Sequence, residues 1–103
     1  MNRIEHLLII LTEECGELAQ DTAKALRFGV DEQRDLPTSN RQRMQKEFND
    51  VLAIIDLLND EAELGPRGID LHRDPKLIRQ KIEKVNRYLE YSKECGTLEA
   101  EHD

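Results

Sequence analysis

Apolar residues recur along the first quarter of the chain at alternating steps of four and three residues. Such spacing places side chains on one face of an α-helix, and it does not fit the two-residue alternation of a β-strand. The predicted apolar row consists of Ile4, Leu8, Leu11, Cys15, Leu18, Thr22 and Ala25. Gly29 stands where a helix commonly ends, so we expect this first helix to end at Phe28.

A second helix is predicted from its end signals as well as from its periodicity. Ser39 is followed three residues later by Gln42, which is the arrangement of a capping box. Gly65 and Pro66 then predict the end of the helix. The apolar row between these signals is Met44, Phe48, Val51, Ile55, Leu58 and Ala62. The 11 residues from Val30 to Asn40 carry no periodic pattern and are predicted to form a connection.

A third helix is predicted to begin after Asp74, which is a suitable N-cap, with Pro75 in the first helical position. Its predicted inward residues are Ile78, Ile82, Val85, Leu89 and Ser92. Gly96 predicts its end. The remaining residues, 97–103, form an acidic tail that we expect to be frayed.

The three predicted helices indicate an all-α fold. We expect a single domain over residues 1–96, in which three antiparallel helices form a four-helix-bundle-like core that is completed by oligomerisation. The chain has 103 residues, no Trp, and only two residues each of Phe and Tyr. Because so short a chain buries a small core by itself, a homodimer or a homotetramer is predicted.

Charge and composition exclude several classes of partner. The formal net charge is −7, which argues against a nucleic-acid polymer, since binders of nucleic acids present a basic face. No apolar run reaches the 18 residues needed to span a membrane. The two cysteines lie far apart and form no Cys-x-x-Cys pair, so a reducing cytoplasm is the expected compartment.

Two pairs of carboxylates accompany the apolar rows. Glu14 and Glu17 lie about 60° apart on the first helix, and Glu47 and Asp50 repeat the same i, i+3 spacing on the second. We expect both pairs to flank the core of two antiparallel neighbours. Four carboxylates gathered at a partly buried site need a compensating cation, and oxygen ligands without His or Cys favour Mg²⁺ or Mn²⁺.

Alternatives remain open for this acidic row. A Glu-x-x-Glu spacing on a helix is commonly a solvated face. Glu13 is offset by 100° from Glu14 and is either part of the site or simply exposed. Gly16, inside the first helix, costs about 1 kcal/mol relative to Ala, and we expect it to let a neighbouring helix or a nucleotide approach closely.

Two stretches carry a family resemblance. "EECGELAQDTAKALRFG" followed by "EFNDVLAIIDLL" resembles the MazG-like branch of the all-α nucleoside triphosphate pyrophosphohydrolases. The pattern of that family is Glu-Glu-x-x-Glu, a spacer, then Glu-x-x-Asp, and the spacer here has 29 residues. "KIEKVNRYLEYSKECG" is loosely similar to the last helix of short phage and bacterial members. The matched positions are Glu13, Glu14, Glu17, Glu47 and Asp50.

The resemblance implies hydrolysis of an NTP or a dNTP between the α and β phosphates. By position, the metal ligands would be Glu14, Glu17, Glu47 and Asp50. Glu13 would join them or orient the attacking water as a general base. Such an ion bridges phosphate oxygens and neutralises charge on the leaving pyrophosphate, which allows a chain of negative net charge to bind a polyanion.

Candidate substrate-binding residues come from two further places. Lys24 shares the carboxylate row of the first helix, and one face of the third helix carries Lys81, Lys84, Tyr88 and Tyr91. One interpretation is phosphate contact by the lysines and stacking of a base or ribose by the tyrosines. The other is an amphipathic flank whose lysines reach solvent and whose tyrosines lie in a subunit interface.

A hypothesis from another class competes with the enzyme. In it, the chain is a non-catalytic helical module for oligomerisation or partner binding, and the acidic row is a structural metal site or an interaction face. The two hypotheses differ in nucleotide affinity, since only the enzyme is expected to bind a nucleotide with Mg²⁺ present.

Overall fold

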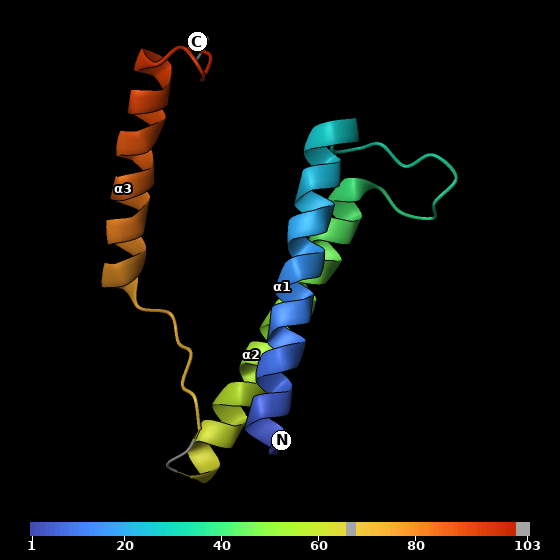
Figure 1. The fold of residues 1–103 in the computed structure, drawn as a ribbon, viewed down its shortest axis with the longest axis vertical. Helices are drawn as coiled ribbons and strands as arrows, with labels where there is room; N and C mark the ends of the chain where they lie inside the picture. The colour runs from blue at the N-terminus through green and yellow to red at the C-terminus, as the bar shows by residue number, and fades with distance from the viewer. Residues whose placement is uncertain (66–67, 101–103) are drawn as a thin grey trace. The chain divides into compact units, whose positions relative to one another are not determined.

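The computed structural model describes residues 1–65 and 68–100, and these fold into three α-helices (Figure 1). The helices are α1 (Arg3–Phe28), α2 (Asn40–Leu64) and α3 (Pro75–Glu94). No strand occurs in the described ranges, so the all-α prediction is confirmed. The stop signal at Pro66 and the last three residues of the acidic tail lie outside the described residues.

The helix ends agree with the predicted signals. Gly29 has a φ of 107° and its N–H donates to the carbonyl of Ala25 at 2.9 Å, which ends α1. At the start of α2 the capping box is complete: the Ser39 N–H donates to Gln42 Oε1 at 2.8 Å, and the Gln42 N–H donates to Ser39 Oγ at 3.2 Å. An additional N-cap, Asn2, accepts from the N–H of Glu5 at 2.8 Å.

The ends of α3 also follow the sequence. Asp74 Oδ1 accepts from the backbone N–H of Lys76 at 2.9 Å, and Gly96 has a φ of 77° just beyond the helix. The tail differs from expectation at its first residues. Thr97 and Leu98 both donate their N–H groups to the carbonyl of Ser92, so the chain folds back on the end of α3 instead of fraying there.

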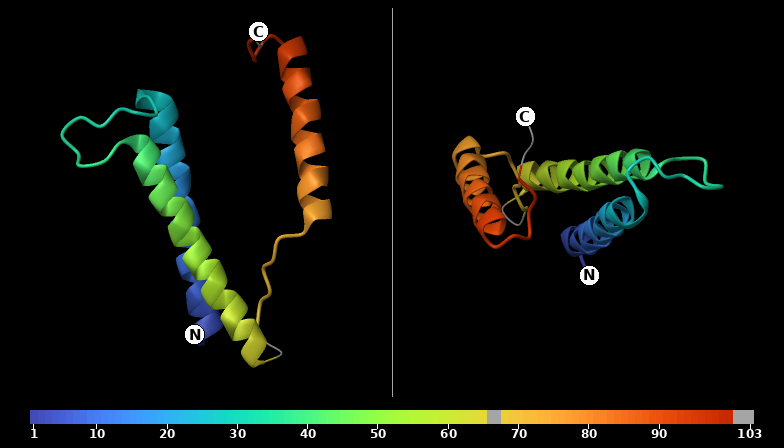
Figure 2. Two further views of the ribbon diagram at one scale, coloured as in Figure 1. Left: turned by 180° about the vertical axis from the view of Figure 1, so that it is seen from behind. Right: turned by 90° about the horizontal axis from the view of Figure 1, so that it is seen from above.

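The helices belong to two separate units. Residues 1–71 hold α1 and α2, and the remainder holds α3. In the first unit α1 and α2 run antiparallel and side by side, as both views of Figure 2 show. Both carboxylate pairs of the sequence lie in this helical hairpin.

The face of α1 that packs on α2 differs from the predicted row. Leu7 and Ala25 are buried, but Cys15 and Thr22 are exposed, so their predicted places in the core are wrong. Between the two buried residues, Glu14 and Asp21 are half-buried at steps that continue the row. The inner face therefore includes polar residues that a search for apolar periodicity passes over. From Leu7 onward this row consists of Leu7, Leu11, Glu14, Leu18, Asp21 and Ala25, and Ile4, Leu8 and Ile10 are half-buried beside it.

The same shift occurs on α2. Leu58 is fully buried as predicted, but Phe48 is 51% exposed and the neighbouring Glu47 is only 8% exposed. A glutamate thus takes the core position that the pattern assigned to a phenylalanine. Of the four carboxylates predicted to flank the core, Glu47 is part of it, Glu14 and Asp50 are half-buried at its edge, and Glu17 is exposed.

The apolar row of α3 is largely exposed. Ile82, Val85 and Leu89 are 41–54% exposed, although they were predicted to face inward, while Ile78 and Ser92 are half-buried. Among the described residues of its own unit, α3 has no second helix that covers this row, although isolated helices depend on packing for most of their stability.

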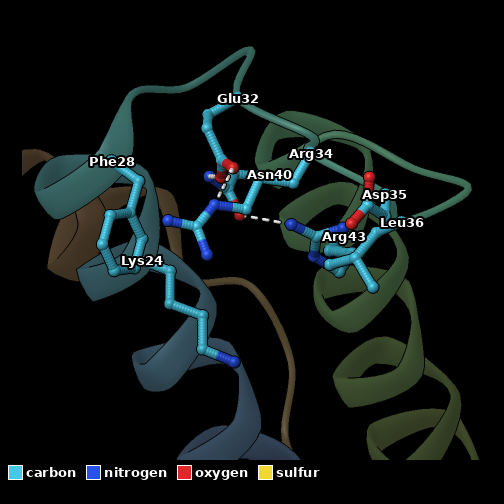
Figure 3. Close-up of a pocket in the computed structure, with 8 residues that line it drawn as sticks. All are labelled: Lys24, Phe28, Glu32, Arg34, Asp35, Leu36, Asn40 and Arg43. Carbon is cyan, nitrogen blue, oxygen red and sulfur yellow. Dashed lines mark hydrogen bonds and ion pairs between the residues drawn. The ribbon is translucent and has the colours of Figure 1, made fainter.

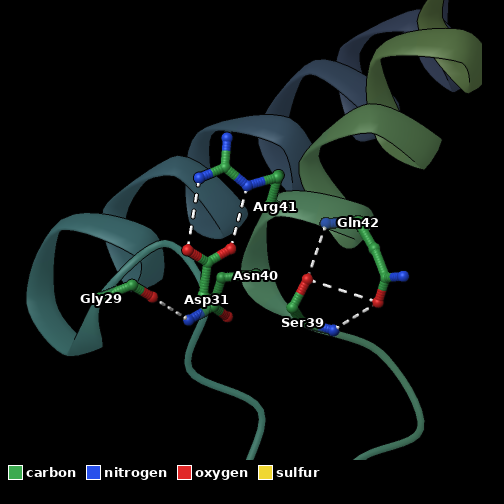
Figure 4. Close-up of polar contacts among 6 residues, drawn as sticks. All are labelled: Gly29, Asp31, Ser39, Asn40, Arg41 and Gln42. Atoms are coloured by element: carbon green, nitrogen blue, oxygen red, sulfur yellow. Dashed lines mark hydrogen bonds and ion pairs between the residues drawn. The ribbon is translucent and has the colours of Figure 1, made fainter.

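The connection between α1 and α2 is tied to the start of α2 (Figure 4). The Asn40 side chain, 1% exposed, donates from Nδ2 to the carbonyl of Gly29 at 2.9 Å. Arg41 forms a two-pronged contact with Asp31, with Nε 3.0 Å from Oδ1. This contact lowers the pKa of the Asp31 carboxyl. The loop is therefore held in one conformation by side chains of the first turn of α2.

The predicted close approach of a neighbouring helix to Gly16 is not found among the described residues, and the approach of a nucleotide stays a prediction. A Cβ atom built on this residue meets nothing within 4 Å, and Gly16 is exposed on the side of α1 away from Glu14. No described segment approaches it, so the structure offers no packing reason for a glycine.

We therefore expect Gly16→Ala to stabilise the protein by about 1 kcal/mol through higher helix propensity. Urea unfolding followed by circular dichroism measures this change. A loss of stability, or a changed molecular mass on size-exclusion chromatography, would instead show that another molecule packs against this position.

Candidate metal centre

Three carboxylates from the two facing helices meet in the interface of the hairpin. Glu14 comes from the middle of α1, and Glu47 and Asp50 come from adjacent turns of α2. One oxygen of each lies within 4.8 Å of the others. Since side chains three or four residues apart share a helix face, the antiparallel pairing brings the two sequence motifs together at one level of the hairpin.

Two of these carboxylates have unsatisfied buried oxygens. Oε2 of Glu14 and Oε2 of Glu47 are both shielded from solvent and accept no hydrogen bond. An unpaired buried carboxylate oxygen is costly, because the lost hydration is not replaced. The pair therefore requires either a shared proton or a bound cation.

The pKa of Glu47 is shifted in the direction that this requirement predicts. The adjacent Glu14 carboxyl, burial and the nearby Glu17 together raise the pKa of Glu47 to about 7. The largest cause is a hydrogen bond with the Glu14 carboxyl, which favours the protonated form of Glu47. Burial and the negative charges of Glu17 and Glu14 disfavour the ionised form as well. Without metal, Glu47 therefore holds a proton up to neutral pH, and a divalent cation would displace that proton.

Lys46 supplies one positive charge at the edge of the cluster. Its Nζ lies 2.6 Å from Oδ2 of Asp50 and 4.0 Å from Oε1 of Glu47. The hydrogen bond to Asp50 raises the pKa of Lys46. The lysine side chain is 71% exposed, and its single charge does not reach the two orphaned oxygens, which still have no partner.

A cavity of about 410 Å³ opens beside the cluster. We call it the carboxylate cavity. It combines acidic, amide and basic side chains, a mixture that suits a cation together with an anionic ligand. Its lining residues are Glu17, Gln20, Asp21, Thr38, Arg43, Lys46 and Glu47.

A second cavity, of about 420 Å³, lies under the connection between α1 and α2 (Figure 3). We call it the loop cavity. Arg43 lines both cavities, so the two meet at this side chain. The lining residues of the loop cavity are Lys24, Phe28, Glu32, Arg34, Asp35, Leu36, Asn40 and Arg43.

The predicted acidic residues fall into three groups. Glu14, Glu47 and Asp50 converge. Glu17 lines the carboxylate cavity and acts on the pKa of Glu47, although it is not among the three converging groups. Glu13 is exposed and belongs to neither the cluster nor a described cavity.

The predicted basic and aromatic residues are dispersed. Lys24 lines the loop cavity, not the carboxylate cavity. On α3, the Lys84 amine lies 6.0 Å from the centroid of the Tyr88 ring, and Tyr88 and Tyr91 are 60% and 61% exposed. These α3 residues, with Lys81, belong to the other unit, and their part in substrate binding stays a prediction.

Sequence reasoning missed Arg43 and Lys46. Both stand four residues before a carboxylate of the cluster, at the spacing where helix side chains are neighbours: Arg43 before Glu47, and Lys46 before Asp50. That spacing was a usable signal. It becomes informative only once the carboxylates are known to face α1.

The donor set fits a hard divalent cation. All three converging groups are carboxylates, without His or Cys, and Mg²⁺ and Mn²⁺ prefer such oxygen ligands. The buried oxygens of Glu14 and Glu47 that accept no hydrogen bond favour the binding of a positive charge. Exposed carboxylates do not require one, because water solvates them. The residues present therefore fit the predicted metal.

Comparison with known proteins finds no match. No protein-family model matches the chain, and neither a curated protein nor a solved structure does so. The resemblance to MazG-like enzymes thus stays a prediction. Within residues 1–65 and 68–100, none of the helices is long and apolar enough to cross a bilayer.

We expect the metal-free protein to lose stability as the pH rises from about 5 to about 8. The pKa of Glu47 is higher in the folded chain than in the unfolded chain, so its contribution is fully present below the unfolded value of 4.5 and is lost as the pH passes the folded value of about 7. Denaturant unfolding with EDTA at both pH values measures this loss.

The Glu47→Gln variant is the control, because it cannot ionise and should show a flatter pH dependence. Mg²⁺ should stabilise the wild type more at the higher pH, where no proton competes with it. Equal stabilisation of wild type and Glu47→Gln by Mg²⁺ would contradict the assignment of the cluster as a metal centre.

Proposed function

We propose that this chain is a Mg²⁺-dependent nucleoside triphosphate pyrophosphohydrolase. It would cleave an NTP or a dNTP between the α and β phosphates to a nucleoside monophosphate and pyrophosphate. The observation that supports this most is the convergence of Glu14, Glu47 and Asp50 across two facing helices, with two buried oxygens that no donor satisfies. The Glu-x-x-Glu and Glu-x-x-Asp order of the sequence adds the resemblance to MazG-like enzymes.

In this proposal the three converging carboxylates hold the cation, and Glu17 adds a fourth oxygen donor from the carboxylate cavity. Bound Mg²⁺, or Mn²⁺ in its place, supplies positive charge to phosphate oxygens and lowers the pKa of a coordinated water. The shared proton of Glu47 leaves when the cation enters, since both compete for the same oxygens.

Arg43 and Lys46 are the basic side chains that suit the phosphate chain. Both line the carboxylate cavity, and charge-assisted hydrogen bonds to phosphate oxygens are among the strongest available to a protein. Lys46 pairs with Asp50 in the metal-free protein. With Asp50 engaged as a metal ligand, the Lys46 amine would be free to contact a phosphate of the substrate.

The reaction itself requires little covalent chemistry from the chain. Water attacks one of the two phosphorus atoms joined by the α–β bridge, the bridging P–O bond breaks, and the proton of the water passes to a carboxylate. Glu17 is an exposed carboxylate that lines the cavity, and it would accept that proton through the oxygen that does not bind the cation. Catalysis then rests on positioning and on charge neutralisation.

We expect Asp50→Asn and Glu47→Gln each to lower kcat by at least about 100-fold, because even groups that only support metal ligands are worth 10–100-fold. The assay measures pyrophosphate release from a panel of NTPs and dNTPs with Mg²⁺ present. Asp56→Asn is the matched control, since Asp56 is an exposed carboxylate on the same helix, outside both cavities.

Two results would reject the enzyme. One is the absence of pyrophosphate release from every nucleotide tested, and the other is full activity in Asp50→Asn. Binding of Mg²⁺ without any nucleotide affinity, measured by calorimetry, would favour the competing hypothesis of a non-catalytic helical module with a structural metal site.

The proposal includes self-association as a homodimer or a homotetramer. The apolar row of α3 at Ile82, Val85 and Leu89 is exposed, and a second copy can bury it as helices of a bundle do. Only Leu7, Ala25 and Leu58 form the buried apolar core of the described residues, which is little for a stable domain.

We therefore expect light scattering coupled to size-exclusion chromatography to give two or four times the mass of one chain. Ile82→Asp should lower that mass, because a carboxylate in an apolar helix interface is strongly disfavoured. Arg79→Asp, an exposed change on the same helix, is the control. A wild-type protein with the mass of a single chain would contradict the proposal.

A further inference from the structure

The loop cavity carries an excess of positive charge. Lys24, Arg34 and Arg43 line it against two carboxylates, Glu32 and Asp35, whereas the whole chain has a net charge of −7. Lys24 makes no ion pair among the described residues, and Arg34 only approaches Glu32 at 3.8 Å. The lining thus has one more basic than acidic side chain, and Lys24 in particular is free to contact an anionic ligand.

The cavity also presents an aromatic ring. Phe28 is 51% exposed at the end of α1. In Figure 3, Phe28 and Lys24 line the α1 side of the hollow, and Arg43, Asp35 and Leu36 lie on the opposite side. The Arg27 guanidinium lies 5.5 Å from the centroid of the Phe28 ring. A ring next to guanidinium groups is a common stacking platform for a planar heterocycle.

The position of the cavity relative to the metal centre sets the direction of a bound nucleotide. On α2, Arg43 lies one turn from Glu47, about 6 Å along the axis, and Asn40 lies about 10.5 Å away. In the other direction along the hairpin, Leu7 and Leu58 are buried and close the interface. Because Arg43 lines both cavities, the loop cavity lies within reach of a phosphate chain that is held at the carboxylates.

We propose that the loop cavity is the nucleoside subsite, with the base stacked on Phe28 and with Arg43 bridging to the phosphates. The inference rests on the proposed function, because it assumes that the phosphate chain is held at the carboxylate cluster. The volume of about 420 Å³ is within the usual range of small-molecule sites. The Asn40 amide does not read the base, since its groups are engaged by Gly29, Glu32 and Arg43.

The loop beside the loop cavity is held by several hydrogen bonds to the start of α2. Its backbone is fixed by Asn40 and by the Asp31–Arg41 contact, and the N–H of Arg41 donates to the carbonyl of Val30 at 2.8 Å. A pre-formed pocket costs less ordering on binding than a mobile one. In this proposal the long connection between the two carboxylate motifs forms the nucleoside end of the site.

Calorimetry of Phe28→Ala with two probes tests the assignment. Nucleoside monophosphates probe the whole subsite, and inorganic tripolyphosphate with Mg²⁺ probes the phosphate and metal half alone. We expect Phe28→Ala to weaken the monophosphates by about 10-fold, as the loss of one base–aromatic stack does, and to leave tripolyphosphate affinity unchanged. Phe28→Leu, which keeps an apolar side chain but no ring, should show a loss in the same direction.

The chain offers a matched control in Phe48→Ala. Phe48 is also 51% exposed but lines neither cavity, and its loss should leave both affinities unchanged. Unaltered monophosphate affinity in both Phe28 variants, in a protein that still hydrolyses nucleotides, would overturn the nucleoside subsite and leave the proposed function intact. A wild type that binds no tripolyphosphate with Mg²⁺ and hydrolyses nothing would instead reject the proposed function and the subsite with it.

Discussion

The central constraint on this protein is the repulsion between carboxylates inside the α1–α2 interface. Glu14 and Glu47 face each other across the hairpin with one buried oxygen each that accepts nothing. A well-packed apolar pair at these positions would hold the two helices together better. Their presence in the core therefore means that the hairpin is stable in full only when a proton or a cation fills the gap between them.

Other features of the hairpin can be understood from this constraint. The apolar core is small because polar groups occupy its middle turns, which leaves Leu7 and Leu58 on one side of the cluster and Ala25 on the other. The loop between the helices compensates with its own polar contacts, above all those of the buried Asn40. Stability is thus concentrated at the two ends of the hairpin, and the site lies between them.

The basic residues of the hairpin complete the same arrangement. Lys46 neutralises the edge of the cluster through Asp50, and Arg43 stands between the carboxylates and the loop cavity. Along α2, the side chains therefore change from acidic at Glu47 to basic at Arg43 within about one turn. This order suits a ligand whose phosphates bind beside the metal and the basic side chains. The organic group of that ligand would lie further along the hairpin, beyond Arg43.

The sequence by itself determined the helices and their ends. Gly29, the Ser39 capping box and Asp74-Pro75 act locally, through backbone hydrogen bonds within a few residues, so their effect can be read without a fold. The spacing of the carboxylate pairs was equally local, and it predicted that Glu14 and Glu47 belong together.

Only the tertiary structure decided which side of each helix is inside. Apolar periodicity assigned Cys15 and Phe48 to the core, but the pairing of α1 with α2 turns Glu14 and Glu47 inward instead. The predicted row and the observed face share Leu11, Leu18 and Ala25, so a rotation of the interface by less than the 100° between neighbouring residues exchanges Cys15 for Glu14. That rotation depends on contacts between residues far apart in the chain, and for the same reason the two cavities that meet at Arg43 were not visible in the sequence.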